Sequence, residues 1–383
     1  MFLSVLIYGS LLWMMSKLSI KSFKTNTFKY MVYAALLFAF IFGIRYGVGR
    51  DYPAYLTNYL SYLKFGYSDA HDELGFDYYQ RICAFLNFHP TIFFGIISFV
   101  EMYLLYYALR NRKYLLLPFT LIFFISAAWL PFSSGVRQAI AFCLFFLAVD
   151  YIDLKYWKNY LLLIFLAFMI HKSAIILLVF YPLLLIKKEW FSREKVQLLI
   201  LFISIFLMLT HFAERLLGDF ENILLLASES LSYDNYLDEQ YADILYKKEE
   251  GIGLGQIIYI IIFSFCILYS NKVKEFFKDD YITRSYNLFF IGANMKFLFN
   301  GSNLFGRLTW YFEYFYLLIG ACTLFYLLKT NKKMYYCFLF FNILLVIAIL
   351  YKGNANFANY YFYWDKHQFE LDHINMDIIK VSE

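Results

Sequence analysis

Apolar runs close to the length of a membrane-spanning helix recur along the whole chain, and they limit the fold more than any other feature. A helix needs roughly 20 apolar residues to cross a bilayer, and it satisfies its own backbone hydrogen bonds there. Of the 383 residues, 62% are hydrophobic and 16% are charged. Soluble proteins average about 25% charged residues. The pattern therefore predicts an all-α polytopic membrane protein.

About eleven or twelve transmembrane segments are expected, because residues 159–186 can be interpreted as one span or two. This stretch is interrupted by His171 and Lys172. The run at 2–16 has no basic region before it and no small-residue cleavage site after it, so we interpret it as a retained span. The expected spans are 2–16, 28–44, 91–109, 114–130, 135–151, 159–170, 173–186, 196–212, 254–270, 284–299, 308–328 and 334–351.

Basic residues in the short connections predict the topology, because cytoplasmic loops carry an excess of Lys and Arg. Both flanks of residues 159–186 are then cytoplasmic, so this stretch should cross twice, with His171 and Lys172 at an outer turn. The N-terminus becomes extracytoplasmic. More than half of the 34 basic residues lie in six connections: 17–29, 110–113, 152–158, 187–195, 271–284 and 329–333.

Two longer connections, 45–90 and 213–253, fall on the outer side in this topology. Each is long enough for one or two amphipathic helices at the membrane surface. The tyrosines of the first connection suit either stacking on sugar rings or an interfacial aromatic belt. We expect a single transmembrane domain, 1–352, and a polar C-terminal tail, 353–383, whose role cannot be inferred from the sequence.

Several motifs of known chemistry are absent from the sequence. It has no D-x-D pair, no zinc-binding H-x-x-H or cysteine cluster, no P-loop and no G-x-S-x-G. The five cysteines form no C-x-x-C pair and are expected to pack within apolar runs. The net charge of +5 reflects the basic loops, so nucleic acid is not an expected partner.

Arginines at the predicted outer face are candidates for binding an anion. Arg137 and Arg307 lie near the starts of predicted spans, where free backbone N–H groups favour negative charge. Guanidinium also binds phosphate in a bidentate manner. Two such arginines facing one cavity would form a metal-free pyrophosphate clamp. The simpler alternative is that each arginine reaches from a helix end into the lipid headgroups.

Asp51, Glu73 and His171 are the candidates for a general base at the same face. Each has a structural alternative. An acid of this loop could pair with Arg45 or Arg50 to hold the loop, and His171 could be a turn residue facing water. Three further charged residues lie within predicted spans, and for these we expect buried pairing or packing rather than catalysis: Glu101, Lys296 and Glu313.

Four short motifs, in order along residues 1–330, resemble the EpsG family of bacterial exopolysaccharide and capsule proteins, which is similar to the Wzy O-antigen polymerases. Each motif alone is short, but four in order are fairly specific. They are R-Y-G-x-G-x-D-Y-x-x-Y from Arg45, E-x-x-F at Glu73–Phe76, S-G-x-R-Q-x-I-A at Ser134–Ala141 and H-K-S-A at His171–Ala174.

The resemblance implies a C-type glycosyltransferase in the bacterial inner membrane, with its active site facing the periplasm or exterior. Such a polymerase transfers a growing glycan from undecaprenyl pyrophosphate to a new lipid-linked repeat unit, with no metal and no cofactor. The expected partners are the lipid-linked oligosaccharide and the bilayer. A chain-length regulator and a flippase are further candidate partners.

The resemblance also implies roles for individual residues. A catalytic role would belong to Asp51, Glu73 or His171. Other functions left open are a glycan ligase, an O-acyltransferase, a lipid-linked oligosaccharide flippase and a structural subunit of the synthesis complex. Substrate binding would involve Arg45, Arg50, Arg137, Gln138 and Arg307.

Overall fold

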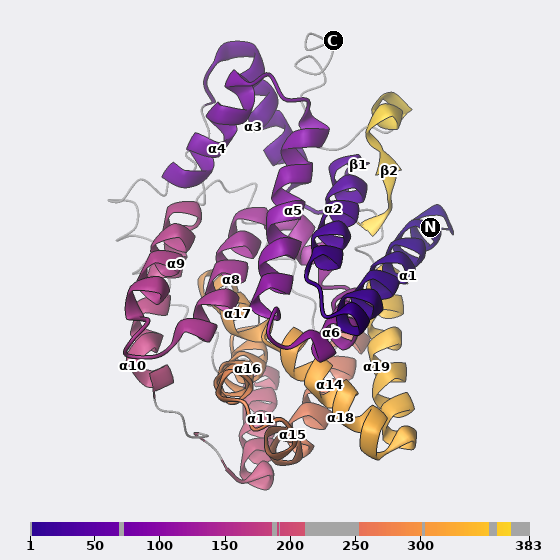
Figure 1. Cartoon of the computed structure of the whole chain (residues 1–383), viewed down its shortest axis with the longest axis vertical. Helices are drawn as coiled ribbons and strands as arrows, with labels where there is room; N and C mark the ends of the chain where they lie inside the picture. The colour runs from indigo at the N-terminus through magenta and orange to yellow at the C-terminus, as the bar shows by residue number, and fades with distance from the viewer. Residues whose placement is uncertain are drawn as a thin grey trace. The chain divides into compact units, whose positions relative to one another are not determined.

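The computed structural model describes residues 2–68, 73–185, 190, 192–210, 253–300, 303–351 and 358–368. These residues are almost entirely helical (Figure 1), so the all-α class is confirmed. The chain divides into two compact units. The first comprises residues 1–186 and 342–383, and the second comprises residues 187–341. The described part of the predicted tail, 358–368, belongs to the first unit.

Within its described residues, the N-terminal part of the first unit contains ten α-helices, one short strand and three 3-10 helices. Its C-terminal part adds the end of one α-helix, a second short strand and a further 3-10 helix. Their bounds are α1 (Phe2–Thr25), α2 (Lys29–Gly43), β1 (Arg45–Tyr46), α3 (Tyr52–Phe65), α4 (Leu74–Phe85), α5 (Pro90–Ala108), η1 (Lys113–Leu115), α6 (Leu116–Ile125), α7 (Trp129–Ser134), α8 (Val136–Ala148), η2 (Val149–Tyr151), α9 (Trp157–Ile170), η3 (Lys172–Val179), α10 (Phe180–Leu185), the end of α19, β2 (Tyr361–Phe362) and η5 (Tyr363–Gln368).

The second unit is described by α-helices alone. Its first helix is separated from the next by residues that the structure does not describe, which include most of the predicted outer connection 213–253. The bounds are α11 (Glu194–Leu209), α14 (Leu254–Leu268), α15 (Ser270–Phe277), α16 (Asp280–Leu298), α17 (Asn303–Glu313), α18 (Tyr316–Thr330) and α19 (Lys332–Tyr351), which continues into the first unit from Asn342.

Four described helices are long and apolar enough to cross a membrane, and a bent pair, α14 with α15, makes a fifth if it counts as one span. Four further apolar helices are shorter, among them α2 and α9. A polytopic membrane protein is thus confirmed, with fewer full-length spans in the described residues than the eleven or twelve predicted. Several predicted spans are short helices, because helix ends interrupt the apolar runs.

Close helix packing organises the first unit. Helix α2 packs on α5, and α5 packs on α8, which in turn contacts α9. Gly43 and Gly95 allow the first of these contacts, since a Cβ on Gly43 would lie 2.6 Å from the backbone oxygen of Thr91. Small residues of this kind let membrane helices approach each other closely.

The stretch 159–186 turns back at His171, as predicted. Helix α9 ends at Ile170, and His171 has an extended backbone with φ −151° and ψ 112°. The following segment then runs back along α9, because the Tyr160 hydroxyl donates to the Leu177 carbonyl at 2.7 Å. The Tyr181 hydroxyl reaches the carbonyl of Asp153, just before α9 begins, at 3.1 Å. The chain therefore returns to the end from which α9 started.

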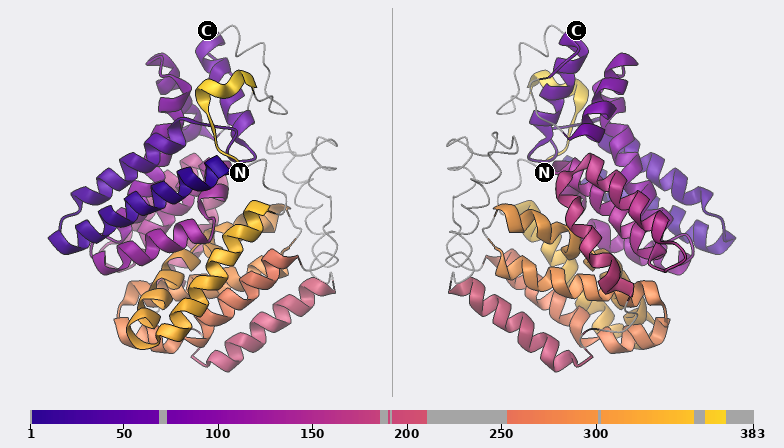
Figure 2. Two further views of the ribbon diagram at one scale, coloured as in Figure 1. Left: turned by 90° about the vertical axis from the view of Figure 1, so that its right-hand side faces the viewer. Right: turned by 90° about the vertical axis from the view of Figure 1, so that its left-hand side faces the viewer.

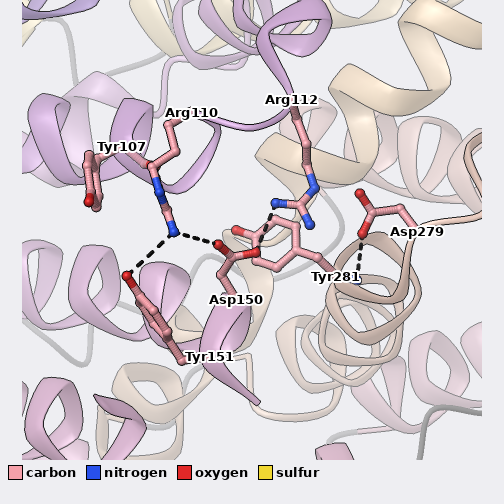
Figure 3. A network of polar contacts seen from close by, with 7 residues as sticks. All are labelled: Tyr107, Arg110, Arg112, Asp150, Tyr151, Asp279 and Tyr281. Atoms are coloured by element: carbon pink, nitrogen blue, oxygen red, sulfur yellow. Dashed lines mark hydrogen bonds and ion pairs between the residues drawn. The ribbon is translucent and has the colours of Figure 1, made fainter. Parts of the chain in front are cut away.

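Predicted cytoplasmic connections lie together at one end of the first unit. Lys113 donates to the backbone oxygen of Asn26 at 2.8 Å. Arg110 and Arg112 each form a 3.0 Å ion pair with Asp150, one with each carboxylate oxygen (Figure 3). The first connection predicted to be outer, 45–90, lies at the opposite ends of these helices, and its described residues form two helices, α3 and α4, as expected.

Candidate active site

The loop of residues 47–51 lies against the end of α7, just before the start of α8. Gly49 has φ +100°, and a Cβ at this position would lie 2.6 Å from the Ser133 backbone oxygen. Only glycine has both the backbone freedom and the small size for this contact. The backbone N–H of Asp51 donates to the Ser134 hydroxyl at 3.2 Å. Both serines are the last residues of α7, and only Gly135 separates them from α8, which carries Arg137.

Arg45, which precedes this loop in the sequence, contacts both the end of α2 and the end of α7. Its side chain is buried, with 1% of its surface exposed. One nitrogen, Nη1, donates to the Phe42 carbonyl at 2.8 Å, and Nη2 donates to the Ser133 carbonyl at 3.3 Å. The guanidinium also lies over the rings of Tyr52 and Phe94, at 5.6 and 5.3 Å from their centroids. These contacts support a structural role for Arg45.

Glu73 occupies the N-cap position of α4, where that helix meets the end of α9. Gly75 makes the approach possible, because a Cβ there would lie 2.8 Å from the backbone oxygen of Met169. Met169 is two residues before His171 in the sequence. The close backbone contact therefore brings the Glu73 carboxylate to the turn that holds His171.

The Glu73 carboxylate binds two of the predicted site residues at once. Its Oε2 accepts from Arg137 Nη1 at 2.5 Å, and its Oε1 lies 2.8 Å from His171 Nδ1. Glu73 and His171 are buried, whereas 21% of the Arg137 side chain is exposed. Three segments that are distant in the sequence thus form one cluster, which we call the Glu73 triad: Glu73, Arg137 and His171.

Two aromatic side chains hold the arginine of the triad. Arg137 Nε donates to the Tyr55 hydroxyl at 3.4 Å. Its guanidinium lies 5.7 Å from the Tyr55 ring centroid and 5.8 Å from that of Phe76. Cation–π contacts of this kind orient a guanidinium without neutralising its charge. Tyr55 was not among the predicted site residues, although it is the last tyrosine of the first EpsG-like motif.

The protonation state of Glu73 follows from its partners. Burial raises the pKa of the Glu73 carboxyl, but the hydrogen bond with His171 and the positive charge of Arg137 outweigh burial and lower the pKa from 4.5 to about 2. The carboxylate is therefore ionised at neutral pH. A neutral His171 then donates from Nδ1 to the carboxylate, and Nε2 carries the lone pair.

The remaining predicted residues have different positions. Arg50 and Asp51 are exposed, and within the described residues neither forms an ion pair with the other or with Arg45. Gln138 is buried on α8, next to Arg137 in the sequence. Arg307 lies on α17 in the second unit, so its meeting with Arg137 in a pyrophosphate clamp stays a prediction.

The charged residues predicted within spans form buried contacts. Lys296 Nζ pairs with Glu313 Oε1 at 2.5 Å and lies 4.1 Å from the Tyr259 ring centroid. This ion pair joins α16 to α17, so the expected pairing is present, with Glu313 buried and 23% of the Lys296 side chain exposed. Glu101 is buried on α5. Among the described residues, no group of three or more His, Cys, Asp or Glu side chains is arranged to hold a metal ion.

Fold and site together define a multi-pass, all-helical membrane protein whose ionisable side chains gather where the helices of its first unit end. Residues 28–364 match the model of the EpsG family, and the chain therefore belongs to that family. EpsG-like proteins are Wzy-type polymerases, which places the chain among the membrane proteins of polysaccharide biosynthesis. No curated protein and no solved structure matches the chain. Its likeness to C-type glycosyltransferases stays a prediction.

Proposed function

We propose that this protein polymerises lipid-linked glycan repeat units at the outer face of the bacterial cytoplasmic membrane. The growing glycan would leave a polyprenyl pyrophosphate, such as undecaprenyl pyrophosphate, and join a hydroxyl of a new lipid-linked repeat unit. The observation that carries the proposal is the Glu73 triad, which puts an oriented imidazole beside a guanidinium. It lies at the end of the first unit opposite the basic connections.

His171 acts as the general base in this proposal. Glu73 holds Nδ1, so Nε2 is the nitrogen that would accept the proton of the acceptor hydroxyl. The hydroxyl oxygen then forms a bond to the anomeric carbon of the donor. The bond between that carbon and the pyrophosphate oxygen breaks, and the pyrophosphate leaves with the electron pair. The proton remains on His171, where the negative charge of Glu73 stabilises the imidazolium.

Arg137 supplies the positive charge for the donor pyrophosphate. It is the second residue of α8, so the backbone N–H groups of the first turn add to its attraction for an anion. Glu73 neutralises this charge while the histidine is neutral. Protonation of His171 gives the Glu73 triad a net charge of +1, at the moment when negative charge develops on the leaving group. Arg307 is the candidate for a second pyrophosphate contact.

Reconstitution with a defined substrate tests the reaction. Purified protein in lipid nanodiscs would receive a polyprenyl-pyrophosphate-linked repeat unit, with chelator present and no nucleotide sugar. We expect a ladder of products that differ by one repeat unit. A requirement for a nucleotide sugar or a metal would contradict the proposed reaction. Transfer of finished polymer to another lipid or protein would instead indicate a ligase, and movement of substrate without any product would indicate a flippase.

The variant Arg137→Ala tests the role of the guanidinium. We expect it to abolish polymer in cells and to leave single lipid-linked repeat units. Arg81→Ala is the matched control. Arg81 lies on α4 and pairs with Asp77, and its side chain is exposed to solvent. Exposed pairs of this kind contribute little to stability. Polymer of normal chain length in the Arg137→Ala strain would overturn the assignment.

A further inference from the structure

The described part of the C-terminal tail lies beside the end of α2, more than 300 residues away in the sequence. Strand β2 pairs with β1 in antiparallel orientation, with Arg45 opposite Phe362 and Tyr46 opposite Tyr361. The segment also lies next to the start of α1 (Figures 1 and 2). We call residues 358–364 the C-terminal clamp.

The C-terminal clamp satisfies backbone oxygens at the end of α2. The last carbonyl groups of a helix have no partner within the helix and need donors from elsewhere. The Tyr360 hydroxyl donates to the Ile41 carbonyl at 2.5 Å, and the Tyr363 backbone N–H donates to the Ile44 carbonyl at 2.9 Å. Of the two carbonyls between them, that of Phe42 accepts from Arg45. The clamp therefore helps to define where α2 ends and where the loop begins.

The first helix anchors the other side of the C-terminal clamp. The Tyr8 hydroxyl donates to the Ala358 carbonyl at 3.1 Å, and the backbone N–H of Tyr360 donates to the Ser4 hydroxyl at 2.9 Å. Ala358 and Tyr360 are buried, with 1% and 2% of their surfaces exposed. A segment that is buried and hydrogen-bonded on both sides is part of the folded unit rather than a loose extension.

The contacts of the clamp continue to the candidate site. The Tyr363 ring lies 6.2 Å from that of Tyr46, edge to face, and belongs to the same buried cluster as Tyr52 and Tyr55. Tyr55 in turn accepts a hydrogen bond from Arg137. The clamp is thus connected to the loop of residues 47–51 through the backbone of β1, which directly precedes that loop. It is connected to Arg137 through the side chains of the aromatic cluster.

We propose that the C-terminal clamp is a positioning segment for the candidate active site. It holds the loop of residues 47–51 against Ser133 and Ser134 and holds Tyr55 against Arg137. A lipid-linked glycan then meets these groups in one arrangement. The activity readout rests on the proposed function, whereas the accessibility readout below does not.

Cysteine accessibility tests the mechanical part of the proposal. Val48 is fully buried in the loop, so Val48→Cys in a Cys337→Ser background should resist a membrane-impermeant maleimide. We expect strong labelling when the chain ends at residue 357. A chain that ends at residue 368 keeps the clamp and should remain protected. Equal protection in both truncated chains would overturn the proposal, even if no variant or wild-type protein makes polymer.

A single hydroxyl tests the effect on the site. Tyr360→Phe removes the hydrogen bond to Ile41, and we expect a roughly 3- to 10-fold higher KM for the lipid-linked acceptor. Tyr351→Phe, which removes an exposed hydroxyl from the end of α19, should leave KM unchanged. A purely structural role for Tyr360 would reduce the amount of active enzyme, and hence the apparent kcat, without changing KM. That result would overturn the positioning role.

Discussion

Glu73 is the residue on which the geometry of the candidate site depends, because its two carboxylate oxygens bind two different side chains. The oxygen that faces His171 fixes the ring and its tautomer, and the oxygen that faces Arg137 balances the guanidinium charge. The exposed acid nearby, Asp51, has neither of these contacts. At the scale of single residues, the structure therefore favours Glu73 as the orienting acid and His171 as the base.

The base is tested by replacing His171 with Asn. Asn cannot take up a proton, so we expect the polymerisation rate to fall on the order of 10²- to 10⁴-fold, the usual contribution of a general base. Lys172→Gln is the matched control at the same turn and should retain most of the rate. The measurement is the initial rate of ladder formation in nanodiscs. An unchanged rate in the His171→Asn variant would rule out the proton transfer to this residue.

The lowered pKa of Glu73 predicts a pH dependence of stability. Because its folded pKa is about 2 and its ordinary pKa is 4.5, ionised Glu73 contributes its full stabilisation above pH 4.5. That contribution is lost as the pH falls from 4.5 toward 2. The melting temperature of wild type should therefore exceed that of Glu73→Gln at pH 7, and the difference should shrink below pH 4.5. Glu275→Gln, at an exposed acid of α15, is the control. A difference that is independent of pH would contradict the ion-pair contribution.

Helix contacts decide whether these side chains can meet. The approach of α4 to α9 depends on Gly75, and the approach of the loop to α7 depends on Gly49. In both contacts the glycine lies against backbone atoms of the other segment, so the contact depends on the absence of a side chain. At the scale of elements, the site is assembled by backbone proximity.

Gly75→Ala should separate Glu73 from His171. The added Cβ would meet the Met169 backbone oxygen at 2.8 Å, so α4 must shift away from α9. We expect a loss of polymerisation rate on the order of that in Glu73→Gln, and a double variant no worse than either single one. Gly9→Ala is the matched control, because nothing lies within 4 Å of the Cβ position there. Fully additive losses would show that Gly75 does not act through Glu73.

For the whole molecule, the two units each carry charged groups that join helices. In the first unit these are the Glu73 triad and the Arg110–Asp150–Arg112 cluster, which lie at opposite ends of its helices. In the second unit, Lys296 and Glu313 join α16 and α17, and the latter helix carries Arg307. Separation of the two clusters in the first unit is the pattern expected of a domain with an inner and an outer end.

Labelling of introduced cysteines tests the orientation of the first unit. In a Cys337→Ser background, Tyr67→Cys and Trp364→Cys replace exposed residues at the predicted outer end, and Leu154→Cys replaces one at the predicted inner end. An impermeant maleimide should label the first two in intact cells. The third should react only after the membrane is permeabilised. The opposite pattern would invert the topology and contradict an outward-facing site.

Local patterns in the sequence were sufficient for some features and not for others. The reversal at His171 follows from basic flanks on both sides of an apolar stretch, and the structure has it. The predicted span 114–130 is instead broken, because α6 ends at Ile125 and α7 begins at Trp129. Ala127 takes the left-handed conformation at this break, with φ 55°. That position is usually glycine, so the residues alone did not indicate a helix end.

The amino-acid sequence by itself determined the membrane class and named all three residues of the Glu73 triad, and its loop charges predict which end of the first unit is cytoplasmic. Hydrophobicity, loop charge and short motifs are local properties of the chain, so they can be recognised in the sequence without knowing how the helices pack. Only the tertiary structure decided that Glu73 binds both Arg137 and His171, which lie 64 and 98 residues away. It also decided that Tyr360 caps a helix 319 residues earlier. Such contacts depend on which helix surfaces approach within hydrogen-bonding distance, and no local pattern encodes that distance.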